Sequence, residues 1–277
     1  MGFQAESAGI SKMDSKIKLF VKFGEHKHIK RLFGGKMYFS NAMKFREIEK
    51  NNGLKGQGDA FEAILPFKNS NAFMKDPETG QSFSRLNTTV FMGFADVANI
   101  PVFCITGISE EDYTLKESHG KRILIVSNTV RDTIKAHFPK ADTAGVFFQP
   151  KLFIDSFNRL GTVYHGEVEY FDFSPEGVIK EMMEYIAQYP GIRSEKNQLL
   201  ASIHMKTNEG EEQRLKITEQ NKKRILFCKD YYFNGEKEYR ILLPKKRISM
   251  PKEYTIRWGK QLKKMYPVDE FFNGVEL

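Results

Sequence analysis

The sequence predicts an α+β protein built around a mixed or antiparallel sheet. Short apolar segments with partial alternation of apolar and polar residues recur along the chain, a pattern typical of strands. Only a few segments carry apolar residues at helical spacing. Hydrophobic residues make up 40% of the 277 residues, which is enough for a buried core and excludes a disordered chain.

The opening of the chain predicts a strand, a short helix and a second strand. Residues 1–15 are small and polar, so we expect them to be frayed. Residues 16–23 alternate partially and predict the first strand. Residues 25–33 predict a helix that ends at Gly34-Gly35, and residues 36–40 predict the return strand.

The remaining chain predicts more strands than helices. Strands are expected at residues 61–67, 88–95, 101–107, 121–127, 144–148, 161–171, 224–228, 237–243 and 253–258. Residues 128–138 carry apolar residues at helical spacing and predict a helix. Glycine-rich residues 51–59 predict a loop, and polar residues 68–87 predict an exposed excursion.

A helical insertion is expected in the second half of a single domain. Ser174-Pro175-Glu176 favours a helix start, because serine caps free amides and proline fits the first turn. The charged residues 191–220 are also expected to be helical. We therefore predict one domain at residues 16–277, with a helical insertion around residues 175–220.

Charge and cysteine content bound the cellular context. The formal net charge is +8, and residues 221–277 carry 14 basic and 7 acidic side chains. Such a basic segment can contact phosphate backbones, or it can be a solvated face that keeps the protein soluble. Two cysteines cannot build a disulfide framework. Neither a secretory signal nor an apolar run of about 18 residues is present, so we expect a cytoplasmic protein that does not contact membranes.

Two neighbouring carboxylates are the strongest candidates for chemistry. The turn Asn234-Gly235 leads to Glu236 and Glu238, at positions i and i+2. In a strand, such side chains point to the same face, so both can address one ligand. The alternative is an ordinary exposed strand start, with charges alternating around Lys237.

Asp59 and Glu62 offer a second, different interpretation. Together with Glu236 or Glu238 they could hold a divalent metal ion, as in a metal-dependent nuclease. Carboxylates three residues apart are also common at an ordinary loop–strand junction. The six histidines have no metal-site spacing, so no metal site is predicted from them.

The order of these motifs resembles a bacterial family of ADP-ribosyltransferase-like toxins and phage-defence proteins. Three features carry the resemblance: the strand–helix–strand opening, Asp59-x-x-Glu62, and the late Glu236-x-Glu238-Tyr239-Arg240. They touch most of residues 17–243, although each motif is short. The resemblance implies a split mixed or antiparallel sheet with flanking helices and insertions, which binds NAD as substrate.

The resemblance also implies roles for particular residues. Glu238 would stabilise the sugar cation that forms when the nicotinamide bond breaks, and Glu236 would position or deprotonate the acceptor. Lys22 or Phe23 stands at the first-strand position, where well-known subclasses have Arg or His. The second-strand residues Tyr38 and Ser40 would support the nicotinamide end. The cations that would neutralise the pyrophosphate are Arg31, Lys36 or Arg46.

We therefore predict an NAD-dependent mono-ADP-ribosyltransferase that acts as a toxin or antiviral effector. The basic terminal segment favours nucleic acid, RNA above all, as acceptor, slightly ahead of protein. An antitoxin is a possible further partner. The alternatives are the metal-dependent nuclease and a non-catalytic nucleic-acid-binding module.

Overall fold

Two compact units make up the protein in its computed structural model. The residues that the structure describes are 16–52, 58–59, 62–67, 72–76, 78–85, 90–93, 95–171, 192–193, 199–206, 212–214, 225–260 and 262–276. Unit 1 comprises Met1–Glu62, Ala98–Tyr170 and Tyr232–Leu277, and unit 2 comprises Ala63–Val97 and Phe171–Tyr231. The sequence predicted one domain with a single insertion. Unit 2 is composed of two separate stretches of the chain.

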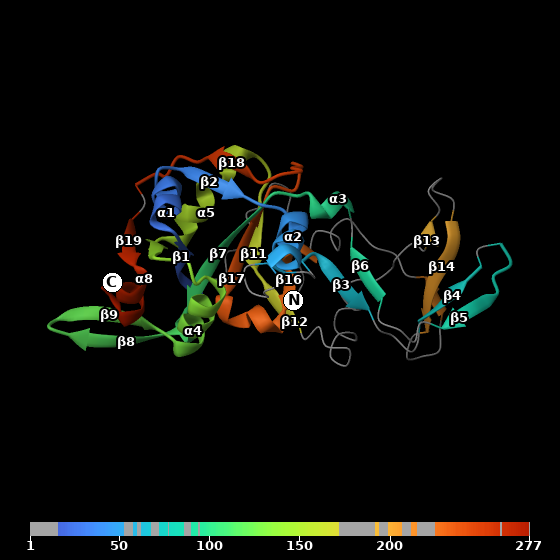
Figure 1. The fold of residues 1–277 in the computed structure, drawn as a ribbon, viewed down its shortest axis with the longest axis horizontal. Helices are drawn as coiled ribbons and strands as arrows, with labels where there is room; N and C mark the ends of the chain where they lie inside the picture. The colour runs from blue at the N-terminus through green and yellow to red at the C-terminus, as the bar shows by residue number, and fades with distance from the viewer. Residues whose placement is uncertain are drawn as a thin grey trace. The chain divides into compact units, whose positions relative to one another are not determined.

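A six-stranded antiparallel sheet is the centre of unit 1 (Figure 1). Its order is β11-β17-β7-β1-β10-β19, and every neighbouring pair is antiparallel. The strands are β1 (Ile17–Gly24), β7 (Val102–Ser109), β10 (Thr143–Phe147), β11 (Tyr164–Glu167), β17 (Glu238–Leu242) and β19 (Lys263–Pro267). The predicted α+β class with an antiparallel sheet is confirmed.

Both faces of this sheet are covered by apolar side chains. Because side chains alternate along a strand, Phe20 and Val21 of β1 enter different core clusters. The cluster of Phe20 includes Phe153 from helix α5 (Pro150–Asp155). The cluster of Val21 includes residues of α4 (Asn128–His137) and α8 (Val268–Asn273). Burial on both faces explains why β1 is apolar over most of its length.

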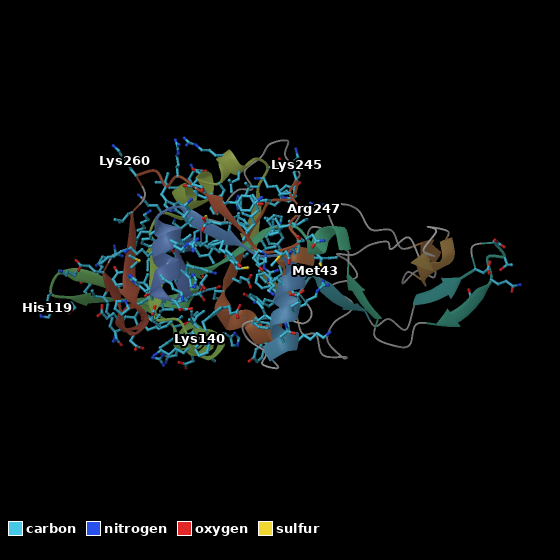
Figure 2. All side chains as sticks on the ribbon, turned by 45° about the horizontal axis from the view of Figure 1, so that its top comes forward. Met43, His119, Lys140, Lys245, Arg247 and Lys260 are labelled. Atoms are coloured by element: carbon cyan, nitrogen blue, oxygen red, sulfur yellow. The ribbon has the colours of Figure 1, made fainter. Side chains whose placement is uncertain are left out.

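Smaller elements of unit 1 surround the sheet. Helix α1 (His26–Phe33) leads into β2 (Lys36–Phe39), which pairs with β18 (Lys252–Thr255). The hairpin of β8 (Tyr113–Ser118) and β9 (Lys121–Val126) turns at His119 and Gly120, and His119 is labelled at its tip in Figure 2. The other elements are α2 (Ala42–Asn52), η1 (Glu110–Asp112), η2 (Asn158–Leu160) and β20 (Val275–Glu276).

Unit 2 contains two further antiparallel sheets. The strand β3 (Ile64–Phe67) pairs with β6 (Val90–Gly93). The second sheet has the order β13-β14-β4-β5, with β15 beside β14. Its strands are β4 (Ala72–Lys75), β5 (Ser82–Arg85), β13 (Ile192–Arg193), β14 (Leu199–Lys206) and β15 (Glu212–Arg214). Helix η3 (Ile225–Phe227) and strand β16 (Cys228–Asp230) end the second stretch of unit 2, while α3 (Ala95–Ala98), β12 (Glu169–Phe171) and η4 (Tyr231–Glu236) lie at its boundaries with unit 1.

The helical prediction for residues 191–220 is wrong where the structure describes them. Residues 199–206 form a strand, because apolar residues occupy every second position and this period-2 pattern outweighs the charged composition of the segment. The apolar positions are Leu199, Ala201, Ile203 and Met205; the positions between them are polar, apart from Leu200. The predicted excursion at residues 68–87 likewise contains two strands, β4 and β5. The predicted helix start at Ser174 lies outside the described residues.

Two other boundaries differ from the prediction. The predicted loop at residues 51–59 begins inside α2, whose last residues are Asn51 and Asn52. Within the described part of the predicted strand at residues 224–228, Ile225–Phe227 form a 3-10 helix, and a strand begins at Cys228. Among the described helices, none has the length and apolar character that a membrane crossing requires.

A buried histidine on β11 makes the stability of unit 1 sensitive to pH. The His165 Nδ1 atom lies 2.7 Å from the hydroxyl oxygen of Tyr239, and Nε2 has no hydrogen-bond partner among the described residues. Burial lowers the pKa of His165, and the Asp155 carboxylate opposes this only in part. The folded protein therefore holds this imidazole neutral at a pH where the unfolded chain protonates it.

We expect wild-type stability to fall as the pH drops below about 6.5, the ordinary histidine pKa. In that range the unfolded state binds more protons at this site than the native state does. The free energy of unfolding of wild type and of a His165→Asn variant should be measured at pH 7.5 and pH 5.5. The free energy of unfolding of wild type minus that of the variant should be smaller at pH 5.5 than at pH 7.5. A difference that stays constant or grows at pH 5.5 would contradict the prediction.

Candidate active site

Strand β7 is the place where three separate elements of unit 1 meet. Residues 106–109 of β7 pair with β1, with Val21 and Thr106 as the last pair, and residues 102–105 do not. At the start of this unpaired stretch, Val102 exchanges two backbone hydrogen bonds with Ser40, at 2.8 and 2.9 Å. The same edge of β7 therefore pairs with β1 at residues 106–109 and with Ser40, which follows β2, at Val102.

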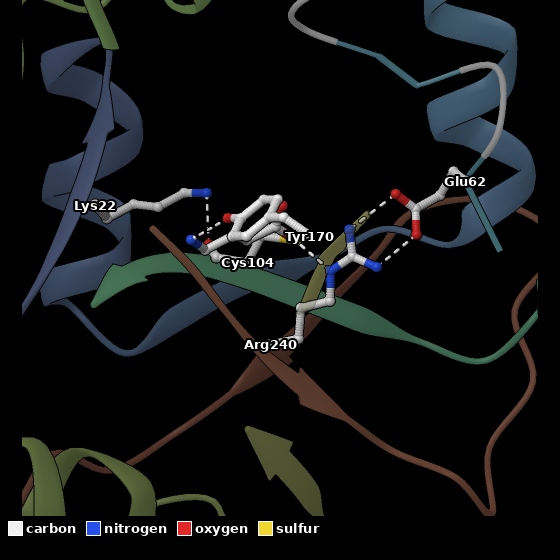
Figure 3. Close-up of polar contacts among 6 residues, drawn as sticks. Lys22, Glu62, Cys104, Tyr170 and Arg240 are labelled. Atoms are coloured by element: carbon white, nitrogen blue, oxygen red, sulfur yellow. Dashed lines mark hydrogen bonds and ion pairs between the residues drawn. The ribbon is translucent and has the colours of Figure 1, made fainter. Parts of the chain in front are cut away.

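Lys22 of β1 contacts β7 beyond the last residue pair of the two strands. Its Nζ donates a 2.7 Å hydrogen bond to the carbonyl oxygen of Cys104 (Figure 3). The same ammonium lies 5.3 Å from the centroid of the Phe103 ring. This contact satisfies a strand carbonyl that β1 no longer reaches, and it fixes a positive charge beside β7.

On the other side of β7, Arg240 joins two carboxylates. The Arg240 Nη1 and Nη2 atoms donate to the two Glu62 oxygens at 2.5 and 2.8 Å, and Nε donates to Glu238 Oε1 at 2.6 Å (Figure 3). All three side chains are buried, and Arg240 is only 1% exposed. Two carboxylates and one guanidinium leave one net negative charge in this group, which we call the carboxylate–arginine triad.

The local sequence explains how the triad forms. Glu238 and Arg240 stand two residues apart in β17, so they share one face of the strand. Glu62 belongs to the Asp59-x-x-Glu62 motif, and its backbone carbonyl accepts a 2.6 Å bond from Arg46 Nε. The backbone amide of Glu238 donates to the Tyr170 hydroxyl oxygen at 2.7 Å, which fixes the start of β17. The planar Arg240 fork suits this bidentate contact, which a lysine cannot make.

The triad sets the protonation of its neighbours. Burial opposes the charged form of Arg240, but Glu238 and Glu62 outweigh it, and the Arg240 pKa is raised well above its usual value. Burial and then the Glu238 carboxylate raise the pKa of the Cys104 thiol well above its usual value, despite Arg240 and Lys22. Cys104 is therefore a neutral thiol at physiological pH, while Arg240 stays charged.

Glu236 does not share the environment of Glu238. It ends the 3-10 helix η4, and Lys237 follows with a φ of 47°, so the alternation of a strand does not apply between the two glutamates. The buried Glu236 carboxylate lies 2.8 Å from Nδ1 of the buried His137 on α4. Lys237 forms an ion pair with the buried Asp112 at 3.1 Å. The expectation of two carboxylates on one strand face is therefore corrected.

The other predicted contact residues lie in different environments. Phe23 is buried in the core, with its ring 5.5 Å from that of Phe271 and 5.6 Å from that of Phe272. Tyr38 is 64% exposed on the outward face of β2. Arg31 is exposed and donates to Glu253 at 2.5 Å. Arg46 is half-buried beside Glu62, where burial lowers its pKa against the pull of the Glu62 and Asp59 carboxylates.

The acidic residues of the proposed metal site are arranged differently from a metal centre. Both Glu62 oxygens accept hydrogen bonds from Arg240, so this carboxylate is engaged by a cation of the protein itself. Within the part of the chain that the structure describes, no group of three His, Cys, Asp or Glu side chains is placed to hold a metal ion.

Comparison of the chain with protein-family models, curated proteins and solved structures finds no match. The assignment of a function therefore depends on the geometry of the site itself.

Sequence reasoning missed two parts of this site. Arg240 was noted as part of a motif but received no role, because nothing local shows that its partner Glu62 is 178 positions away. His137 was treated as one scattered histidine. Its burial at the end of an amphipathic helix was the available signal, since a buried imidazole requires a polar partner.

Proposed function

We propose that this protein transfers ADP-ribose from NAD to an acceptor nucleophile. The observation that carries the proposal is the convergence on β7, within residues 102–106. Lys22 from β1 bonds Cys104, Ser40 directly after β2 bonds Val102, and Glu238 from β17 stands opposite Thr106. These are the three positions that the resemblance to ADP-ribosyltransferases assigns to nucleotide contact, ribose support and chemistry.

The charge of the triad suits this reaction. Cleavage of the bond between ribose and nicotinamide develops positive charge on the sugar. Arg240 holds the Glu238 carboxylate in one orientation at 2.6 Å, and the same guanidinium also binds the second carboxylate, Glu62. A negative group fixed before the reaction stabilises such a transition state without reorganisation, and burial strengthens the effect.

The remaining residues have supporting roles in the proposal. Lys22 offers its ammonium to the NAD phosphates, although without the bidentate geometry of arginine. Glu236 and His137 anchor η4 and so position the start of β17. The resemblance that motivates the proposal also carries the expectation of a toxin or antiviral effector.

Replacing Glu238 with glutamine should reduce transfer about 10²–10³-fold, the size seen when one stabilising group of a transition state is removed. Glutamine keeps the shape of the side chain, and Arg240 retains both bonds to Glu62. Transfer is measured as label moved from radiolabelled NAD to cellular RNA or to lysate protein.

Glu47→Gln is the matched control, because Glu47 is an exposed glutamate on α2 that pairs only with Lys44 among the described residues. Its transfer rate should equal that of wild type. Folded wild-type protein that neither transfers ADP-ribose nor releases nicotinamide from NAD would refute the proposed function. Unchanged transfer by a folded Glu238→Gln variant would refute the role of Glu238.

A further inference from the structure

One segment of unit 1 is rich in exposed cations. Residues 244–264 include eight basic side chains and a single acidic one, Glu253. We call these eight the basic strip: Lys245, Lys246, Arg247, Lys252, Arg257, Lys260, Lys263 and Lys264. Figure 2 shows Lys245, Arg247 and Lys260 along the upper edge of the view, whereas Lys140 lies toward the lower edge.

Most cations of this strip are open to solvent. Six of its members are exposed, and none of these six forms an ion pair with a carboxylate among the described residues. Arg247 is held by the carbonyl oxygens of Pro244 and Lys246, at 2.8 and 2.9 Å. Glu253, the one acid, is bound by Arg31 at 2.5 Å and lies 3.8 Å from Lys36. The strip therefore presents fixed positive charge to solvent.

An exposed aromatic ring lies next to this charge. Tyr38 of β2 stands directly opposite Glu253 of β18, on the outward face that also carries Lys36. Its neighbours in β2, Met37 and Phe39, point into the core. The exposed ring therefore stands on a strand that is anchored by buried side chains. A half-buried tyrosine, Tyr254, lies within the strip with the Lys246 ammonium 4.7 Å from its ring.

We infer that the β2–β18 ribbon and the basic strip bind single-stranded nucleic acid. Cations spaced along a segment track the phosphates, and an exposed aromatic ring offers a stacking platform for a base. A base in a duplex is already stacked on its neighbours, so Tyr38 favours a single strand over a double helix. The inference goes beyond the proposed transfer reaction, because this binding requires neither NAD nor Glu238.

Binding is tested by fluorescence anisotropy of a labelled 12-nucleotide RNA, without NAD, over a range of salt concentrations. Wild type should bind with an affinity that falls steeply with salt, since each contacted phosphate of a single strand contributes about −0.7 to the slope of log affinity on log salt. The triple variant Lys245→Glu, Arg247→Glu, Lys260→Glu should flatten that slope by about 2 and weaken binding more than 10-fold.

A second triple variant distinguishes the effect of the basic strip on RNA binding from the effect of the overall net charge. Lys116→Glu, Arg122→Glu and Lys140→Glu change the net charge equally, at exposed positions outside the strip. This variant should retain most of the wild-type affinity. Equal loss in both triple variants would overturn the inference, because binding would then follow net charge alone.

The Tyr38→Ala variant tests the stacking platform. Loss of one stacked base should weaken RNA binding between about 5-fold and 150-fold, with little change in the salt slope. Unchanged binding by this variant would overturn the role of Tyr38. Preference for an RNA duplex, or for phosphatidylserine vesicles over the oligonucleotide, would overturn the single-strand inference. A Glu238→Gln variant should bind RNA as wild type does, so failure of the transfer reaction leaves this result unaffected.

Discussion

Replacing Arg240 with methionine is expected to lower the free energy of unfolding by about 3–5 kcal/mol, the cost of removing one member of a buried ion pair. Methionine preserves an unbranched side chain but leaves Glu62 and Glu238 buried without the guanidinium that binds both. Trp258, the single tryptophan, reports urea unfolding of unit 1 by fluorescence, because it packs against Phe147 and Phe153.

Arg31→Met is the matched control for this prediction. It is the same substitution beside a carboxylate, but Arg31 is exposed and Glu253 is only half-buried, so the loss of this pair should cost no more than about 1 kcal/mol. Similar costs for the two variants would show that burial does not govern the strength of the triad.

Removing the charges of both carboxylates from the Arg240→Met variant provides a second check. Adding Glu62→Gln and Glu238→Gln should recover part of the lost stability, because two neutral amides then replace two buried carboxylates that have lost their guanidinium.

Elements with strong local patterns could be predicted from the sequence. The strand at β1, the helix α1 with its glycine end and the helix α4 follow from apolar spacing and capping residues. The strand β14 was missed because the charged residues around it concealed the alternation of Leu199, Ala201, Ile203 and Met205. Composition is a weaker guide than periodicity in such a segment.

The candidate site was predictable only in part, and for a physical reason. Glu238 lies in a regular strand, so its neighbour Arg240 on the same face could be read from the sequence. Glu236 precedes a residue with positive φ, a turn that reorients the chain and breaks the rule of alternating faces. The pairing of Glu62 with Arg240 depends on tertiary contact between distant segments, which no local pattern encodes.

Replacing Gly35 with alanine should disrupt the attachment of β18 to β2. Gly35 has a φ of 84°, and a Cβ atom built there would lie 2.1 Å from the carbonyl oxygen of Ile256. The Gly35 carbonyl itself accepts a 2.7 Å bond from the Ile256 amide. The left-handed backbone alone costs an alanine about 1–2 kcal/mol. Because backbone must also move, we expect a total loss near 3 kcal/mol or more, measured by urea unfolding.

Gly120→Ala isolates the contribution of the close approach. Gly120 has a nearly equal φ of 73°, but no atom lies within 4 Å of the added Cβ, so only the backbone cost of about 1–2 kcal/mol should appear. The difference between the two variants measures how tightly Ile256 is held against β2. If both lose equal stability, β18 can shift at no cost, and the ribbon is not the rigid support on which Tyr38 would stack a base. A larger loss for Gly35→Ala, accompanied by weaker RNA binding, would link the packing of this one glycine to the binding surface above it.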